Sequence, residues 1–396
     1  MNKISRIFLP IIMMIVWLMP VSNQWNTLND EMVRNCYLLN LVVLLLVLFY
    51  EGRLNRKQLL ISSCIVLILF ISTILYFQLN RSIARISYGY LLNYIPFCVL
   101  INIKIDKLSR SEILDYLFVM ICSLLIAVGI LTILGNGLIE RLLKTNYIVH
   151  YPHIYMVMWS GHKTVTFFGT HSIAAYIYFM LWWLIDYRAQ VKMSILNYVL
   201  MAGIFLIIIL CKSVSAVLCA GLIAMYYYVK WIRRTTKKNV ILSLSLIVVG
   251  LCGIAVNINT LMQILGSREN GILGRYGSTG NLTDTLYYTF TNIIPMGICD
   301  INGLWLTDGG QYIHFIRGGI LLVGLFYFGL YRFIKMNIKD KGRGTFLFVC
   351  FLLFEIGYQF TMCMRFFMIM LFFVAYYGYL RKEREYTNAI INQSYL

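Results

Sequence analysis

Charged residues are scarce in this sequence, and acidic residues are the scarcest. Only 13% of its 396 residues are charged, with 16 Asp and Glu against 34 Lys and Arg. An ordinary soluble domain has roughly 25% charged residues, so this chain lacks the surface of a soluble protein. Intrinsic disorder is excluded as well, because disorder requires low hydrophobicity and 60% of this chain is hydrophobic.

The sequence also has only five prolines, and it lacks the alternating ten-residue strands of an outer-membrane barrel. Apolar runs of about 20 residues take their place, each long enough to cross a bilayer as a helix. We therefore predict an all-α polytopic membrane protein, with residues 1–396 as one integral membrane domain. The twelve predicted spans are 4–22, 36–50, 59–79, 88–103, 113–135, 171–187, 194–211, 214–230, 240–258, 313–333, 345–361 and 364–380.

Lysine and arginine are distributed unevenly around these spans. If the N-terminus is cytoplasmic, 23 of the 34 fall in inner segments, and every inner loop is basic. The positive-inside rule therefore predicts cytoplasmic N- and C-termini. The net charge of +18 is then a consequence of topology, and no nucleic-acid partner is expected.

Two predicted outer segments are long, 136–170 and 259–312. Ordered proteins rarely have structureless loops longer than about 15 residues unless the loop is functional. Residues 266–280 in the second loop include five glycines together with Arg268 and Arg275. Glycines allow backbone N–H groups to turn toward an anion, although a plain flexible loop is an equally good interpretation.

The predicted outer cations are mostly arginine, at eight of eleven positions. The positive-inside rule disfavours cations there, and arginine binds phosphate bidentately, so the set indicates a membrane-bound phosphate or diphosphate. The alternative for any single arginine is a lipid headgroup or an acidic partner. The candidates for diphosphate binding are Arg275, Arg268, Arg317, Arg81 and Arg85.

Candidate acid–base groups also fall on the predicted outer side. Asp308 precedes His314 and Arg317, which share a face if this segment is helical. His171 begins another span, where capping or packing is as good an explanation as catalysis. The alternative for His314 and Arg317 is interfacial anchoring. Glu355 is the one carboxylate well inside a span, and we expect it to pair with Arg365 or a tyrosine.

No metal or cofactor is predicted. The ten cysteines show no CxxC or Cys/His zinc spacing, and most lie in apolar runs, where cysteine is a small hydrophobic residue. No glycine-rich P-loop is present either.

Four stretches resemble bacterial O-antigen and capsular polysaccharide polymerases of the Wzy type, to which the O-antigen ligases are related. They are TFFGTHSIAA at 166–175, KSVSA at 212–216, Arg275-Tyr276 followed by NIIPMG at 292–297, and DGGQYIHFIRGGI at 308–320. The layout of about twelve spans with a large outer loop before the last three is similar too. Where the ligases have a glycine about eleven positions after a histidine, His314 here is followed by Gly318, Gly319 and Gly324, so the polymerases fit better.

This resemblance implies glycosyl transfer at the outer face of the bacterial inner membrane, without metal or nucleotide. A growing glycan would move from a polyprenyl diphosphate carrier onto a lipid-linked repeat unit. The arginines would stabilise the diphosphate, and Asp308, His314 or His171 would act as the base. Implied partners are a polyprenyl diphosphate-linked oligosaccharide, membrane lipid, a repeat-unit flippase and a chain-length regulator.

Two alternatives remain at this point. One is a ligase that transfers finished polymer to lipid A core. The other is a lipid-linked oligosaccharide flippase or transporter, for which paired acidic groups at the bilayer midplane and short loops would be expected. The two long outer loops and the scarcity of charge within the spans favour an enzyme.

Overall fold

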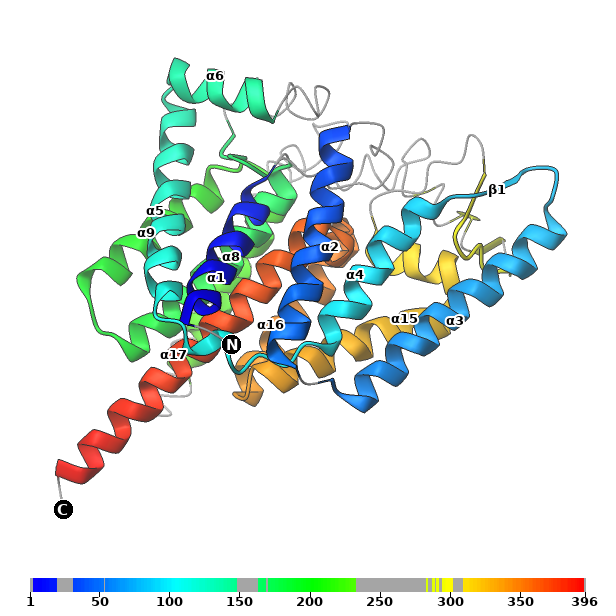
Figure 1. The fold of residues 1–396 in the computed structure, drawn as a ribbon. Helices are drawn as coiled ribbons and strands as arrows, with labels where there is room; N and C mark the ends of the chain where they lie inside the picture. The colour runs from blue at the N-terminus through cyan, green and yellow to red at the C-terminus, as the bar shows by residue number, and fades with distance from the viewer. Residues whose placement is uncertain are drawn as a thin grey trace.

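The described part of the chain forms a helical bundle with a small two-stranded sheet (Figure 1). This computed structural model describes residues 3–19, 31–52, 54–147, 163–168, 170–232, 283, 287, 288, 290, 291, 294–301 and 309–394. The first helices are α1 (Lys3–Leu18), α2 (Glu31–Glu51), α3 (Arg56–Leu79), α4 (Leu91–Asn102), α5 (Ile113–Ile133) and α6 (Gly137–Asn146). The later helices are α8 (His171–Val191), α9 (Ile195–Ile209), α10 (Val214–Ile232), α15 (Gly310–Asn337), α16 (Lys341–Gly357) and α17 (Met364–Ser394).

Eleven of the twelve predicted spans coincide with a helix, and the twelfth, 240–258, lies outside the described residues. Within the described part, five helices are long and apolar enough to cross a membrane, namely α3, α5, α10, α15 and α17. Shorter apolar helices occupy Ser5–Leu18, Asn35–Glu51 and Ile195–Ile209. The chain is therefore a helical protein of membrane type, and twelve crossings with cytoplasmic termini remain a prediction.

Helices α8 and α17 form the centre of the bundle. Residues Ser172–Arg188 of α8 are buried on every side, and so are nearly all residues of α17 as far as Leu380. Helices α9 and α10 pack on α8, and α1, α2, α4 and α5 pack on α17, so the other helices surround these two. The last residues of α17 continue beyond the bundle toward the C-terminus (Figure 1).

Capping residues set several helix boundaries. The side chains of Asn55, Asn136, Thr170, Ser194 and Asp340 accept hydrogen bonds from the backbone of the first turns of α3, α6, α8, α9 and α16. Such caps satisfy N–H groups that have no partner within the helix. The residues between α9 and α10 form a turn, so two helices replace one long helix there, as the sequence predicts.

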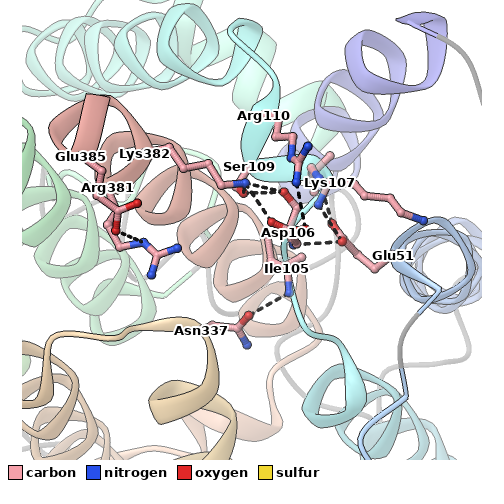
Figure 2. Close-up of polar contacts among 11 residues, drawn as sticks. Glu51, Ile105, Asp106, Lys107, Ser109, Arg110, Asn337, Arg381, Lys382 and Glu385 are labelled. Atoms are coloured by element: carbon pink, nitrogen blue, oxygen red, sulfur yellow. Dashed lines mark hydrogen bonds and ion pairs between the residues drawn. The ribbon is translucent and has the colours of Figure 1, made fainter. Parts of the chain in front are cut away.

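Segments predicted to be cytoplasmic meet at one end of the bundle. Asp106 and Lys107, between α4 and α5, donate backbone N–H groups to the carboxylate of Glu51, while Lys382 of α17 donates to Asp106 (Figure 2). The backbone N–H of Ile105 is bound by Asn337 at the end of α15. These contacts place the loops on a common side, as the distribution of basic residues requires.

Two ionic clusters tie the helices together near their predicted inner ends. Asp115 of α5 accepts from Arg188 at 2.9 Å and from Lys192 at 3.3 Å, both at the end of α8. Asp186, also in α8, is bound by Arg343 of α16 at 3.0 Å and by Lys230 of α10 at 3.4 Å. Both carboxylates are largely buried, which makes these pairs structural connections between helices.

At the other end, strand β1 (Ala84–Ile86) pairs antiparallel with β2 (Cys299–Ile301). Arg85 lies opposite Asp300, and Ile86 lies opposite Cys299. The pairing joins the connection between α3 and α4 to the segment that leads into α15. The first predicted long outer loop, 136–170, contains α6, and most of the second, 259–312, lies outside the described residues.

Candidate functional site

Helix α15, which contains the span predicted at 313–333, is not continuous. It breaks at Gly318 and Gly319, and Gly319 has φ +65° and ψ −166°, a conformation that only glycine adopts readily. Two segments result, 310–317 and 320–337, and the first contains both His314 and Arg317. Because of this break, both side chains lie in the interior of the protein.

Arg317 is fully buried and connects α15 to β2. Its Nη1 donates hydrogen bonds to the carbonyl oxygens of Gly297 and Cys299, and its guanidinium lies 3.3 Å from the centre of the Tyr90 ring. In return, the N–H of Gly297 donates to the carbonyl of Arg317 at 2.9 Å. The face of an aromatic ring attracts a cation, so Tyr90 holds the guanidinium in place.

His314 is also fully buried, one helical turn from Arg317. Its Nδ1 lies 3.0 Å from the hydroxyl oxygen of Tyr94, and its ring packs on Phe326 with ring centroids 3.8 Å apart. The pair His314 and Arg317 therefore faces the pair Tyr94 and Tyr90 at the start of α4. The predicted common face is confirmed, whereas interfacial anchoring is wrong, because neither side chain is exposed.

Glu355 lies close to the start of α15. Its carboxylate accepts hydrogen bonds from the backbone N–H of Thr361 and, at 3.2 Å, from the hydroxyl of Tyr327. Gly310 approaches so closely that a Cβ there would overlap with Oε2 of Glu355. The sequence allowed either Arg365 or a tyrosine as the partner of Glu355, and the hydrogen bond is to tyrosine.

The described parts of the stretches that carry the family resemblance form two pairs in space, and Arg275-Tyr276 lies outside the described residues. Ser215 of KSVSA donates to Ser172 of TFFGTHSIAA at 2.9 Å, which joins α10 to α8. The segment NIIPMG binds the backbone of DGGQYIHFIRGGI through Met296 and Gly297. The end of α16 lies between α8 and α15, because Phe354 stacks on Tyr176, the residue after TFFGTHSIAA, and the adjacent Glu355 contacts Gly310 of α15.

The other predicted site residues are distributed less compactly. Arg81 and Arg85 are exposed, on the turn before β1 and on β1 itself. His171 is half-buried at the start of α8, which packs on α9, α10 and α17, whereas α15 packs on α3, α4 and α16. Asp308, Arg268 and Arg275 lie outside the described residues.

Three residues at this site were not predicted from the sequence. Tyr90 and Tyr94 hold Arg317 and His314, and Asp300 places a half-buried carboxylate opposite Arg85. The two tyrosines are four residues apart at the predicted outer end of a span, and this spacing could have indicated that they share one face of a helix. Asp300 gave none, because its position depends on strand pairing across the sequence.

No group of three or more metal-binding side chains occurs within the described part of the chain. No protein-family model, curated protein or solved structure matches this sequence. The site itself is cationic and rich in hydrogen-bond donors. Its arginine, histidine and tyrosine side chains lie beside the carboxylates of Glu355 and Asp300.

Proposed function

We propose that this chain is a polysaccharide polymerase of the bacterial inner membrane. It would transfer a growing O-antigen or capsule glycan from polyprenyl diphosphate onto a lipid-linked repeat unit at the outer face. The observation that carries the proposal is the pairing of the described parts of the matching stretches. Ser215 of KSVSA contacts Ser172 of TFFGTHSIAA, and Met296 and Gly297 of NIIPMG bind the backbone of DGGQYIHFIRGGI, although these segments are far apart in sequence.

The charges at this end suit a diphosphate leaving group. Arg81 and Arg85 are exposed beside the β1–β2 ribbon, and Arg317 is held against the same ribbon through Cys299. Fixed cations that stabilise developing negative charge are the main electrostatic contribution to such a transfer. Both substrates are anchored in the membrane, so positioning lowers the barrier further.

The acceptor hydroxyl requires a base in this mechanism. Asp308, His314 and His171 are the candidates from the sequence, and Asp300 is a further carboxylate at the ribbon. Arg268 and Arg275, which lie outside the described residues, are further candidates from the sequence for binding the diphosphate. The implied partners remain a repeat-unit flippase and a chain-length regulator.

A transporter is the second candidate, and the break in α15 is the observation that favours it. Discontinuous helices with ionisable groups beside the break form substrate sites in many transporters. Here His314 and Arg317 precede the break, and Glu355 lies near the start of the same helix. A ligase would use the same diphosphate chemistry as the polymerase.

Surface glycan from a deletion strain separates these functions. A single repeat unit on the final acceptor, with single lipid-linked units at the outer face, supports a polymerase. Full-length polymer left on the lipid carrier would indicate a ligase. Single units trapped at the inner face would indicate a flippase, and an unchanged glycan ladder would reject all three.

Complementation of that strain tests the arginines. We expect Arg85→Ala and Arg275→Ala to abolish or shorten the polymer at normal protein levels. Arg110→Ala is the matched control, because Arg110 is an exposed arginine at the opposite end of the bundle. Normal polymer in both outer variants would remove these arginines from the mechanism.

A further inference from the structure

The first segment of α15 has buried hydrogen-bonding atoms without partners. Within the described part of the chain, Nε2 of His314 and both Nε and Nη2 of Arg317 have no hydrogen-bond partner. Both side chains have 0% exposure. Buried polar atoms without partners are rare, and each one lowers the stability of the folded protein. Three such atoms on two side chains one helical turn apart therefore require an explanation.

The contact with Tyr94 determines which tautomer of His314 is present. The Tyr94 hydroxyl has one hydrogen bond among the described residues, at 3.0 Å to Nδ1 of His314. If Nδ1 carried the proton, the Tyr94 proton would have no acceptor and the Nε2 lone pair would have no donor. If Tyr94 donates to Nδ1, only the Nε2–H is left over, so hydrogen-bond counting assigns the Nε2–H tautomer.

The surroundings keep this imidazole neutral. Aromatic rings pack against it, namely Phe326, Tyr327 and Tyr94, and no carboxylate within the described residues pairs with it. A charged imidazole without a counter-ion is disfavoured in such surroundings. In this state Nε2 is a donor, and it has no lone pair with which to accept a proton.

We propose that Tyr94 is a positioning residue that fixes His314 as a hydrogen-bond donor, and that His314 and Arg317 together bind a diphosphate oxygen. The structure supplies Nε2–H from His314 and Nε–H and Nη2–H from Arg317, a donor set that suits an oxyanion. The identity of the diphosphate as a polyprenyl carrier rests on the proposed function. This assignment gives His314 a role other than the base, which leaves Asp308, Asp300 and His171 as the candidates for the base.

In the proposed binding, the first segment of α15 must move before an anion reaches these donors, because both side chains are fully buried. Gly318 and Gly319 separate the segment that holds His314 and Arg317 from the rest of the helix. Backbone rotation is least restricted at glycine, so this is where the segment would bend, and the movement must break the hydrogen bonds from Arg317 to Gly297 and Cys299. A shift of this kind would expose the two side chains from their fully buried positions.

Nitrogen NMR of the full-length, ¹⁵N-histidine-labelled protein in detergent tests the tautomer. His314→Gln identifies the signal, and we expect a pyridine-like Nδ1 and a pyrrole-like Nε2. Tyr94→Phe should yield a mixture of tautomers, whereas Tyr88→Phe, which alters an exposed tyrosine nearby, should leave the signal unchanged. A protonated Nδ1 in the unmodified protein, or an unchanged signal in Tyr94→Phe, would overturn the proposal.

Titration of the same sample identifies the ligand. We expect inorganic diphosphate and farnesyl diphosphate to shift the Nε2 signal, with affinity about tenfold weaker in Tyr94→Phe. A shift with phosphatidylglycerol micelles alone would assign the donors to lipid headgroups and contradict the diphosphate. These NMR measurements need no glycan, so they are independent of the deletion strain. If the protein binds diphosphate but its deletion leaves the polymer unchanged, the proposed function is rejected. The assignment of His314 and Arg317 as diphosphate donors would still stand.

Discussion

The ring of His314 lies against the ring of Phe326, with centroids 3.8 Å apart, although the two residues are twelve positions apart and lie on opposite sides of the break in α15. In a straight helix these residues would be about 18 Å apart along the axis. The contact therefore depends on the break at Gly318 and Gly319. This bend brings polar side chains of the first segment into the protein interior.

Gly319→Ala should weaken this bend. Alanine at φ +65° and ψ −166° is strained, and we expect the free energy of unfolding to fall by about 1–3 kcal/mol. Gly324→Ala is the matched control, because its backbone is helical and a Cβ added there would have no atom within 4 Å. Unfolding in detergent, followed by circular dichroism, measures both, and equal stability of the two variants would contradict the role of the break.

Gly310→Ala should disturb the contact with Glu355. An added Cβ would overlap with Oε2 of Glu355, so either the carboxylate or the start of α15 must move. Overpacking of this kind costs about 1–3 kcal/mol of unfolding free energy. Glu355→Asp in the same chain retracts the carboxylate and should restore part of the loss. A double-mutant cycle with additive effects would show that the two positions are not coupled.

Glu51→Gln should destabilise the end of the bundle drawn in Figure 2. The carboxylate accepts three successive backbone N–H groups, from Asp106 and Lys107 at 2.9 Å and from Leu108 at 2.8 Å. An amide replaces one acceptor oxygen with a donor, so we expect a loss of about 2–3 kcal/mol in unfolding free energy. Glu112→Gln, at an exposed position, should change it by less than about 0.5 kcal/mol. Similar unfolding midpoints for the two variants would argue against this anchor.

Asp186→Asn should leave cations of two neighbouring helices without their shared partner. Asp186 is bound by Arg343 and Lys230 and also by the hydroxyls of Tyr226 and Tyr227. Removing one member of a buried ion pair costs about 3–5 kcal/mol. In Asp340→Asn the new residue is an equally good helix cap at an exposed position, so denaturant unfolding should hardly change. Comparable stability of the two variants would show that Asp186 is dispensable.

The sequence alone was enough to place eleven of the described helices, whereas α6 lies in the segment 136–170 that was predicted as a loop. Long apolar runs predict them because a helix satisfies its backbone hydrogen bonds locally, whatever surrounds it. The turn between α9 and α10 was predicted on the same basis, from the length that one crossing allows. The sequence also predicted that the basic loops lie on one side of the bundle, because this depends only on where lysine and arginine occur along the chain.

Only the tertiary structure decided how the site is built. A Gly-Gly pair is compatible with a helix or with a break, so the bend in α15 and the burial of His314 and Arg317 could not be read from local sequence. The partners of these side chains, Tyr94 and Tyr90, lie more than 200 residues earlier, and the position of Asp300 depends on strand pairing. Such contacts are selected by packing and by the need to satisfy buried polar groups, which act across the whole chain.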